Sequence, residues 1–200
     1  NERGWVMNPI LNLQSLNPRY HGELRKCATD QVLCAAEMRQ ALFALLGHKP
    51  KIVQSMYFEG NAETWEHQDT YYLDAENLGA MVAAWVALED IDADAGRFFI
   101  CPKSHLIEIG RQSKSDNVAT NHHVYIQKIV EIIKNKNMEI RAPKLNRGDV
   151  VFWNARTIHG SLASQGAVST RSSITLHAIP SHSRLLQLQT RLLDVQTEDI

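Results

Sequence analysis

Short segments of branched and aromatic residues, separated by turn-forming residues, recur along the chain from residue 51 onward. Such segments are typical of strands, and several of them in one chain favour an antiparallel β-sandwich or barrel. The Glu59-Gly60-Asn61 stretch marks the first turn between them. The predicted strands are Lys51–Phe58, Ala80–Leu88, Arg97–Cys101, Val150–Trp153 and Ile174–Ile179.

Helical patterns precede and interrupt these strands. Thr29 or Asp30 is a suitable N-cap, and Gly47 a suitable C-terminal residue, for a helix whose apolar residues fall on one face. We expect a mainly β protein with flanking helices, organised as a single domain over residues 1–200. Its predicted parts are a helical support (1–50), a β core (51–180) with a helical insert (107–136), and a C-terminal tail (181–200). The insert is predicted to form a lid near the mouth of the active site.

Composition restricts the partners that the chain is expected to bind. Lysine plus arginine number 21 and aspartate plus glutamate 22, which gives a net charge of −1. This balance provides no electrostatic basis for binding nucleic acid or an anionic membrane surface, so neither partner is expected. The 3 cysteines are few and contain no CxxC pair, which argues against a disulfide framework and a zinc ribbon. A reducing, cytoplasmic location is the expectation.

The triplet His67-Gln68-Asp69 is the first candidate for chemistry. Residues i and i+2 of an extended chain point to the same side, so this imidazole and this carboxylate can hold one metal ion. Triplets of this kind also arise by chance, and a surface polar pair is the alternative.

Two further groups follow in the same order along the chain. His159 comes after the apolar strand that Gly148-Asp149 begins, about 90 residues beyond Asp69, and Arg171 follows 12 residues later. Two histidines and one carboxylate form the facial triad of non-haem Fe(II) oxygenases, with positions left open for a bidentate 2-oxo acid and O₂. The planar guanidinium of arginine suits the distant carboxylate of such a co-substrate.

With these residues, the chain resembles the phytanoyl-CoA dioxygenase family of Fe(II)/2-oxoglutarate oxygenases from about Lys51 to Pro180. The stretches that carry the resemblance are Trp65–Asp69, Pro102–His105, Gly148–Trp153, His159–Ser161 and Arg171-Ser172. The chain departs from the family pattern at Lys103, where a glycine is usual, and in Ile107–Asn121. The resemblance implies a double-stranded β-helix, that is, a cupin-like jelly roll, in agreement with the strand pattern.

The resemblance also implies roles for particular residues. His67, Asp69 and His159 would hold Fe(II), and Arg171 would bind the C5 carboxylate of 2-oxoglutarate. Further co-substrate contacts are expected from Gln54, Ser161 and Ser173, and substrate contacts from Tyr71, Tyr72 and Trp153. His177 is expected to be a core or pocket-lining residue, and His122 and His123 to be solvated.

The expected activity is hydroxylation or another oxidation of a small organic or natural-product substrate. It would use Fe(II), 2-oxoglutarate and O₂ and release succinate and CO₂. Halogenating relatives have a small residue in place of the carboxylate ligand, and Asp69 is present here. Three alternatives remain: a non-catalytic jelly-roll binding protein, a hydroxylase of an acyl-CoA thioester, and a zinc hydrolase with the same ligands.

Overall fold

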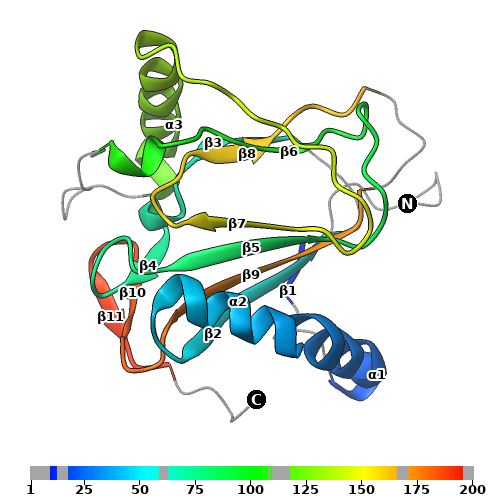
Figure 1. Ribbon diagram of the computed structural model, residues 1–200. Helices are drawn as coiled ribbons and strands as arrows, with labels where there is room; N and C mark the ends of the chain where they lie inside the picture. The colour runs from blue at the N-terminus through cyan, green and yellow to red at the C-terminus, as the bar shows by residue number, and fades with distance from the viewer. Residues whose placement is uncertain are drawn as a thin grey trace.

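The computed structural model describes residues 10–12, 18–58, 63–107, 109, 118–165 and 171–195. Its strands form two sheets that lie one over the other, together with a smaller third sheet at one side (Figure 1). The helices are α1 (Pro18–Ala28), α2 (Ala36–Leu46) and α3 (Val118–Asn135). The strands are β1 (Ile10–Asn12), β2 (Pro50–Phe58), β3 (Thr64–His67), β4 (Leu73–Ala75), β5 (Val82–Ala87), β6 (Phe98–Ile100), β7 (Val150–Asn154), β8 (His159–Ser161), β9 (Ser173–Pro180), β10 (Leu185–Gln187) and β11 (Arg191–Leu193).

The large sheet has the order β1-β2-β9-β5-β7, and all its pairings are antiparallel. The five strands that the sequence predicts are confirmed as β2, β5, β6, β7 and β9, with ends that differ by at most two residues. β5 and β9 are buried along their whole length, because elements cover the large sheet on both faces.

The small sheet has the order β3-β8-β6 and lies over one face of the large sheet (Figure 1). Phe98 of β6 makes the contact, with its ring centroid 5.9 Å from that of Trp85 on β5 and 4.9 Å from that of Trp153 on β7. Two antiparallel sheets packed in this way form the jelly roll that the sequence predicts.

Helix α2 covers the opposite face of the large sheet (Figure 1). Met38 and Leu42 of α2 are buried there with alternate residues of β5 and β9, such as Ala84 and Leu176. Successive strand residues point to opposite faces, so the residues between them face the small sheet instead. The fold therefore gives β5 and β9 one face for a hydrophobic core and one face for a site.

The N-terminal helical region differs from the sequence-based prediction. A single helix between Thr29 or Asp30 and Gly47 is wrong, because α1 ends at Ala28, a π-helical turn spans Thr29–Leu33, and α2 follows. Neither predicted N-cap residue caps a helix, because Ala35 takes an extended conformation and α2 begins after it. The Gly47 end is confirmed: its φ is 70°, which glycine adopts without a steric penalty, and its N–H donates to the Phe43 carbonyl at 2.8 Å.

Two further segments bear on the predicted parts of the chain. Within the predicted insert, α3 is a helix, whereas residues 108 and 110–117 lie outside the described residues. The segment that the sequence assigns to a tail is partly a hairpin, because β10 pairs with both β11 and β4. None of the helices in the described ranges combines the length and the apolar character required for a membrane span.

Candidate metal centre and its surroundings

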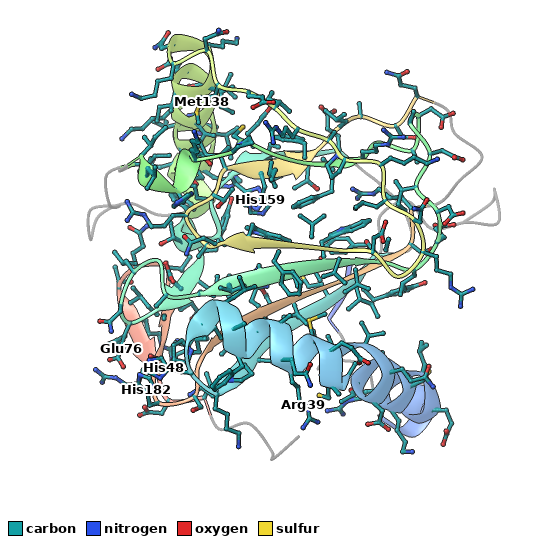
Figure 2. All side chains as sticks on the ribbon, viewed as in Figure 1. Arg39, His48, Glu76, Met138, His159 and His182 are labelled. Atoms are coloured by element: carbon teal, nitrogen blue, oxygen red, sulfur yellow. The ribbon has the colours of Figure 1, made fainter. Side chains whose placement is uncertain are left out.

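His67, Asp69 and His159 come together between the two sheets, with one ligand atom from each lying within 4.8 Å of the others. Asp69 Oδ1 is 3.6 Å from His67 Nε2 and 3.4 Å from His159 Nε2. Figure 2 shows His159 directed from β8 into the space between the sheets. Among the described residues, no other group of three or more histidine, cysteine or acidic side chains meets in this way.

The neighbouring backbone fixes which nitrogen of each histidine faces the centre. His67 Nδ1 lies 2.9 Å from the Trp65 carbonyl, and His159 Nδ1 lies 2.9 Å from the Thr157 carbonyl. A carbonyl oxygen only accepts, so Nδ1 is the donor in both contacts, and the Nε2 atoms are left to face the centre. This arrangement is the one that metal-binding histidines use, and it prepares the two rings for a cation.

Loops that join the sheets hold the carboxylate near the two histidines. Asp69 begins a 3₁₀ turn (Asp69–Tyr71), and the Thr70 N–H of this turn donates to the Ala155 carbonyl at 3.1 Å. The adjacent Gln68 side-chain amide donates to the Arg156 carbonyl. These bonds connect the turn that carries Asp69 to the turn before His159. The predicted His-x-Asp geometry is therefore modified, because Asp69 lies just past the end of β3 rather than within it.

Asp69 is ionised in this environment. Burial alone raises the pKa of a carboxyl group, but the charges and hydrogen bonds of His159 and His177 outweigh it and hold the pKa of Asp69 well below its usual value. The centre therefore offers one carboxylate and two imidazole rings, the donor set of non-haem iron proteins.

Arg171 lies in the same cavity and is 4% exposed. Its guanidinium carbon is 5.9 Å from the centroid of the Trp85 ring, its Nε has no hydrogen-bond partner, and no ion pair to it occurs among the described residues. Burial lowers the pKa of Arg171 to about 10, so the side chain remains charged at neutral pH. Its φ of 59° is uncommon for a residue with a side chain. A buried cation without an anion is suited to bind an anionic ligand.

The cavity that contains these groups has a volume of about 200 Å³. This is below the roughly 300–1,000 Å³ of pockets that enclose drug-sized ligands, so the space suits a small diacid. Ser161 and Trp153, both predicted site residues, line it together with the triad and Arg171. Its other lining residues are Met56, Phe58, Thr64, Trp85, Phe98, Gly160, Thr175 and His177.

Several predicted site residues lie near the cavity without lining it. Gln54 on β2 is the cross-strand partner of His177, so the two side chains leave the sheet on the same face. The Ser173 side chain is fully buried, and its hydroxyl has no hydrogen-bond partner. Tyr71 is stacked on Tyr125 of α3 with a centroid separation of 3.7 Å. Their roles as co-substrate or substrate contacts stay predictions.

Tyr72 connects the centre to helix α3. Its ring centroid is 5.7 Å from that of His67, and its hydroxyl is 2.5 Å from His122 Nε2. His122 is thus partly buried against aromatic side chains, whereas the sequence predicts it to be solvated. The correction has a physical cause, because α3 packs on β3 and brings His122 to within 5.3 Å of the Trp65 ring.

The sequence-based site omits several cavity residues that strand alternation could have indicated. Met56 and Phe58 follow Gln54 at intervals of two on β2, and Thr175 follows Ser173 in the same way on β9. His177, two residues further along, is predicted from the sequence to be a core or pocket-lining residue and does line the cavity. Once one residue of such a series is assigned to the cavity face, the period of two assigns the others.

Solved structures with this architecture include a non-haem enzyme and a protein with bound iron. One is "non-heme alpha ketoglutarate dependent carbocyclase SnoK from nogalamycin biosynthesis", with a TM-score of 0.66 and 21% identity over 90% of this chain and 66% of that chain. Another is EctD from S. alaskensis with bound Fe, with a TM-score of 0.63 and 19% identity over 84% of this chain and 57% of that chain. At these identities the likeness establishes the jelly-roll fold.

Sequence comparisons identify closer relatives. Phytanoyl-CoA dioxygenase domain-containing protein 1 of Bos taurus is 37% identical over 130 residues, which are 61% of this chain and 43% of that protein. The Mus musculus protein of the same name is 36% identical over 78 residues, 36% of this chain and 27% of that protein. The chain thus spans less than half of the curated relatives that it matches. The profile of "Phytanoyl-CoA dioxygenase (PhyH)" matches residues 10–172, and the chain belongs to this family.

Proposed function

We propose that the chain is an Fe(II)/2-oxoglutarate-dependent oxygenase that hydroxylates, or otherwise oxidises, a small organic substrate. One observation carries this proposal: a His-Asp-His triad and a buried arginine without an anionic partner occupy a single small cavity. Bound iron and 2-oxoglutarate would supply the oxidising chemistry, consuming O₂ and releasing succinate and CO₂. The family assignment and the named neighbours, one of them EctD with 2-oxoglutarate and 5-hydroxyectoine, support it.

Different residues of the cavity would bind the metal and the co-substrate. His67, Asp69 and His159 would hold the metal through Nε2, Oδ1 and Nε2, and Arg171 would bind the far carboxylate of 2-oxoglutarate with its planar pair of donors. Trp85 and Phe98 form an apolar wall that keeps water from the enclosed co-substrate.

The substrate would bind beside the small cavity, since a cavity of about 200 Å³ leaves little room beyond the co-substrate. Aromatic side chains lie beside the His67 edge of the centre: the Tyr72 ring is 5.7 Å from His67, and Trp65 of the same strand is 52% exposed. We assign substrate contact to this edge, and a small or natural-product molecule with an apolar surface fits it.

An acyl-CoA substrate is less well supported by the position of the basic residues. Arg39, Lys49 and Lys51 line a groove of about 450 Å³ between α2 and β2. Figure 2 shows Arg39 on α2, on the opposite side of the large sheet from His159. Phosphates bound in this groove would be separated from the metal centre by the sheet.

The test is succinate formation from 2-oxoglutarate by the purified protein across a metabolite panel, with and without Fe(II). We expect turnover that requires iron and that one class of substrate stimulates. His67→Ala, Asp69→Ala and His159→Ala should each abolish it, because each removes a ligand. Full turnover by any of these variants with iron bound would reject the triad. Tight 2-oxoglutarate binding without iron-dependent turnover would favour the non-catalytic binding protein.

A further inference from the structure

The two carboxylate oxygens of Asp69 have different neighbours. Oδ1 faces the metal-binding nitrogens of His67 and His159. Oδ2 instead accepts a hydrogen bond of 2.8 Å from Trp153 Nε1 and lies 3.4 Å from His177 Nε2. The carboxylate is 4% exposed, so water cannot readily replace either neighbour. One oxygen is thus directed at the candidate metal position and the other at two nitrogens.

Both nitrogens are suited to hold an anionic oxygen. The indole Nε1 of Trp153 is a donor only. His177 is 3% exposed, and neither of its ring nitrogens makes a hydrogen bond within the described part of the chain; the approach of Nε2 to Asp69 Oδ2 at 3.4 Å is an ion-pair distance. A buried polar group without a partner is costly, so Oδ2 is the acceptor that this environment offers to His177 Nε2.

The strand register explains how the two nitrogens come close to the same oxygen atom. Ala83 on β5 is the cross-strand partner of Trp153 on β7 and also of His177 on β9. The three residues therefore form one row across the large sheet, with the smallest side chain in the middle. The methyl group of Ala83, which is fully buried, leaves space between the two larger rings for the carboxylate. The three residues of this row therefore leave a space that accommodates Asp69 Oδ2.

We propose that Trp153 and His177 are positioning residues that reserve Oδ2, so that Asp69 binds the metal through Oδ1 alone. The proposal rests on the proposed function, because it assumes a metal at the triad. A carboxylate that binds through both oxygens occupies two positions of an octahedron. Reserving one oxygen limits the protein to three positions and leaves three open for the co-substrate and O₂. Trp153 then acts on the metal site through Asp69, in addition to its predicted place beside the substrate.

The experiment compares Co(II) binding by the parent protein and by four variants. Trp153→Phe and His177→Phe keep a ring of similar shape and remove the donor. His177→Gln keeps an N–H close to the position of Nε2, and His48→Phe is the matched control, because it makes the same histidine-to-phenylalanine change at an exposed residue well away from His159 (Figure 2). Isothermal titration gives the Co(II) dissociation constant, the visible spectrum of bound Co(II) reports its coordination, and thermal denaturation without metal shows whether each variant folds.

We expect Trp153→Phe and His177→Phe each to raise the Co(II) dissociation constant roughly 10- to 100-fold, as losses of outer hydrogen bonds to metal ligands do. The Co(II) spectrum should change as Oδ2 becomes free to bind, whereas the spectra and affinities of His177→Gln and His48→Phe should remain close to those of the parent. Unchanged Co(II) affinity and spectrum in both Phe variants would overturn the inference. A parent protein whose Co(II) affinity does not depend on His67 would overturn the proposed function instead.

Discussion

Replacing Gly160 with alanine should damage the metal centre without touching any ligand. Gly160 lies between His159 and Ser161 on β8, the central strand of the small sheet. A Cβ built on Gly160 would lie 2.7 Å from the Thr64 carbonyl oxygen of β3 and 2.9 Å from the Phe99 ring of β6. Real Cβ atoms essentially never make contacts under 3.0 Å, so β3, β6 or both must move.

The required movement gives the expected magnitude. The Thr64 carbonyl must retreat by about 0.7 Å to reach the 3.4 Å of an ordinary contact, and a backbone atom cannot rotate away as a side chain can. Overpacking of this kind costs about 1–3 kcal/mol. For a chain of this size that corresponds to a melting temperature lower by about 2–12 °C. Because His67 is on β3 and His159 is on β8, the same movement separates the two imidazoles.

The assay is thermal denaturation of the metal-free protein together with a Co(II) titration. We expect Gly160→Ala to melt at a lower temperature and to bind Co(II) at least about tenfold more weakly, as when supports of metal ligands are lost. Gly22→Ala is the control, because nothing lies within 4 Å of a Cβ there and alanine is the better helix former by about 1 kcal/mol. A Gly160→Ala protein with the parent's melting temperature and Co(II) affinity would refute the reasoning.

Three further changes test other parts of the structure. Arg171→Lys should weaken 2-oxoglutarate binding roughly 10- to 150-fold by removing a charge-assisted hydrogen bond of about 1.5–3 kcal/mol, with iron affinity unchanged. Anaerobic titration of the iron-to-2-oxoglutarate charge-transfer band measures this, and unchanged affinity would mean that another cation binds the C5 carboxylate. Tyr72→Phe removes the hydroxyl contact with His122, which is worth about 0.5–1.5 kcal/mol, and should therefore speed amide hydrogen exchange in α3. Unaltered exchange would show that this contact does not stabilise α3. Iodoacetamide should modify the exposed Cys27 in the native protein but not Cys101, because burial raises the pKa of the Cys101 thiol to about 11. Early labelling of Cys101, detected by mass spectrometry, would contradict its burial.

The sequence predicts the parts of this fold that local patterns encode. Strands such as Ile174–Ile179 are recognisable because β-branched residues recur in them, and burial on both faces explains why apolar and polar residues do not alternate strictly. His67, Asp69 and His159 are recognisable as candidate ligands because these residue types, in this order, are typical of an iron site. A pattern of this kind does not depend on knowing the contacts between the strands.

Other features escape the sequence because they depend on tertiary contacts. The hairpin of β10 and β11 requires β4 as a partner, and residues 73–75 alone give no sign of that pairing. His122 occupies a polar helix start in the sequence, and only the packing of α3 on β3 brings it to Tyr72. The row of Trp153, Ala83 and His177 requires the register of three strands, two of which are separated by the insert.

The surroundings of Asp69 also bear on the motion of the two sheets relative to each other. Through Oδ1 the carboxylate reaches His67 and His159 of the small sheet, and through Oδ2 it reaches Trp153 and His177 of the large sheet. The side chain of Asp69 therefore links the two sheets. A cation bound at Oδ1 would strengthen this link. Separation of the two sheets would pull Asp69 away from His67 and His159 or from Trp153 and His177, so we expect a bound cation to slow that separation.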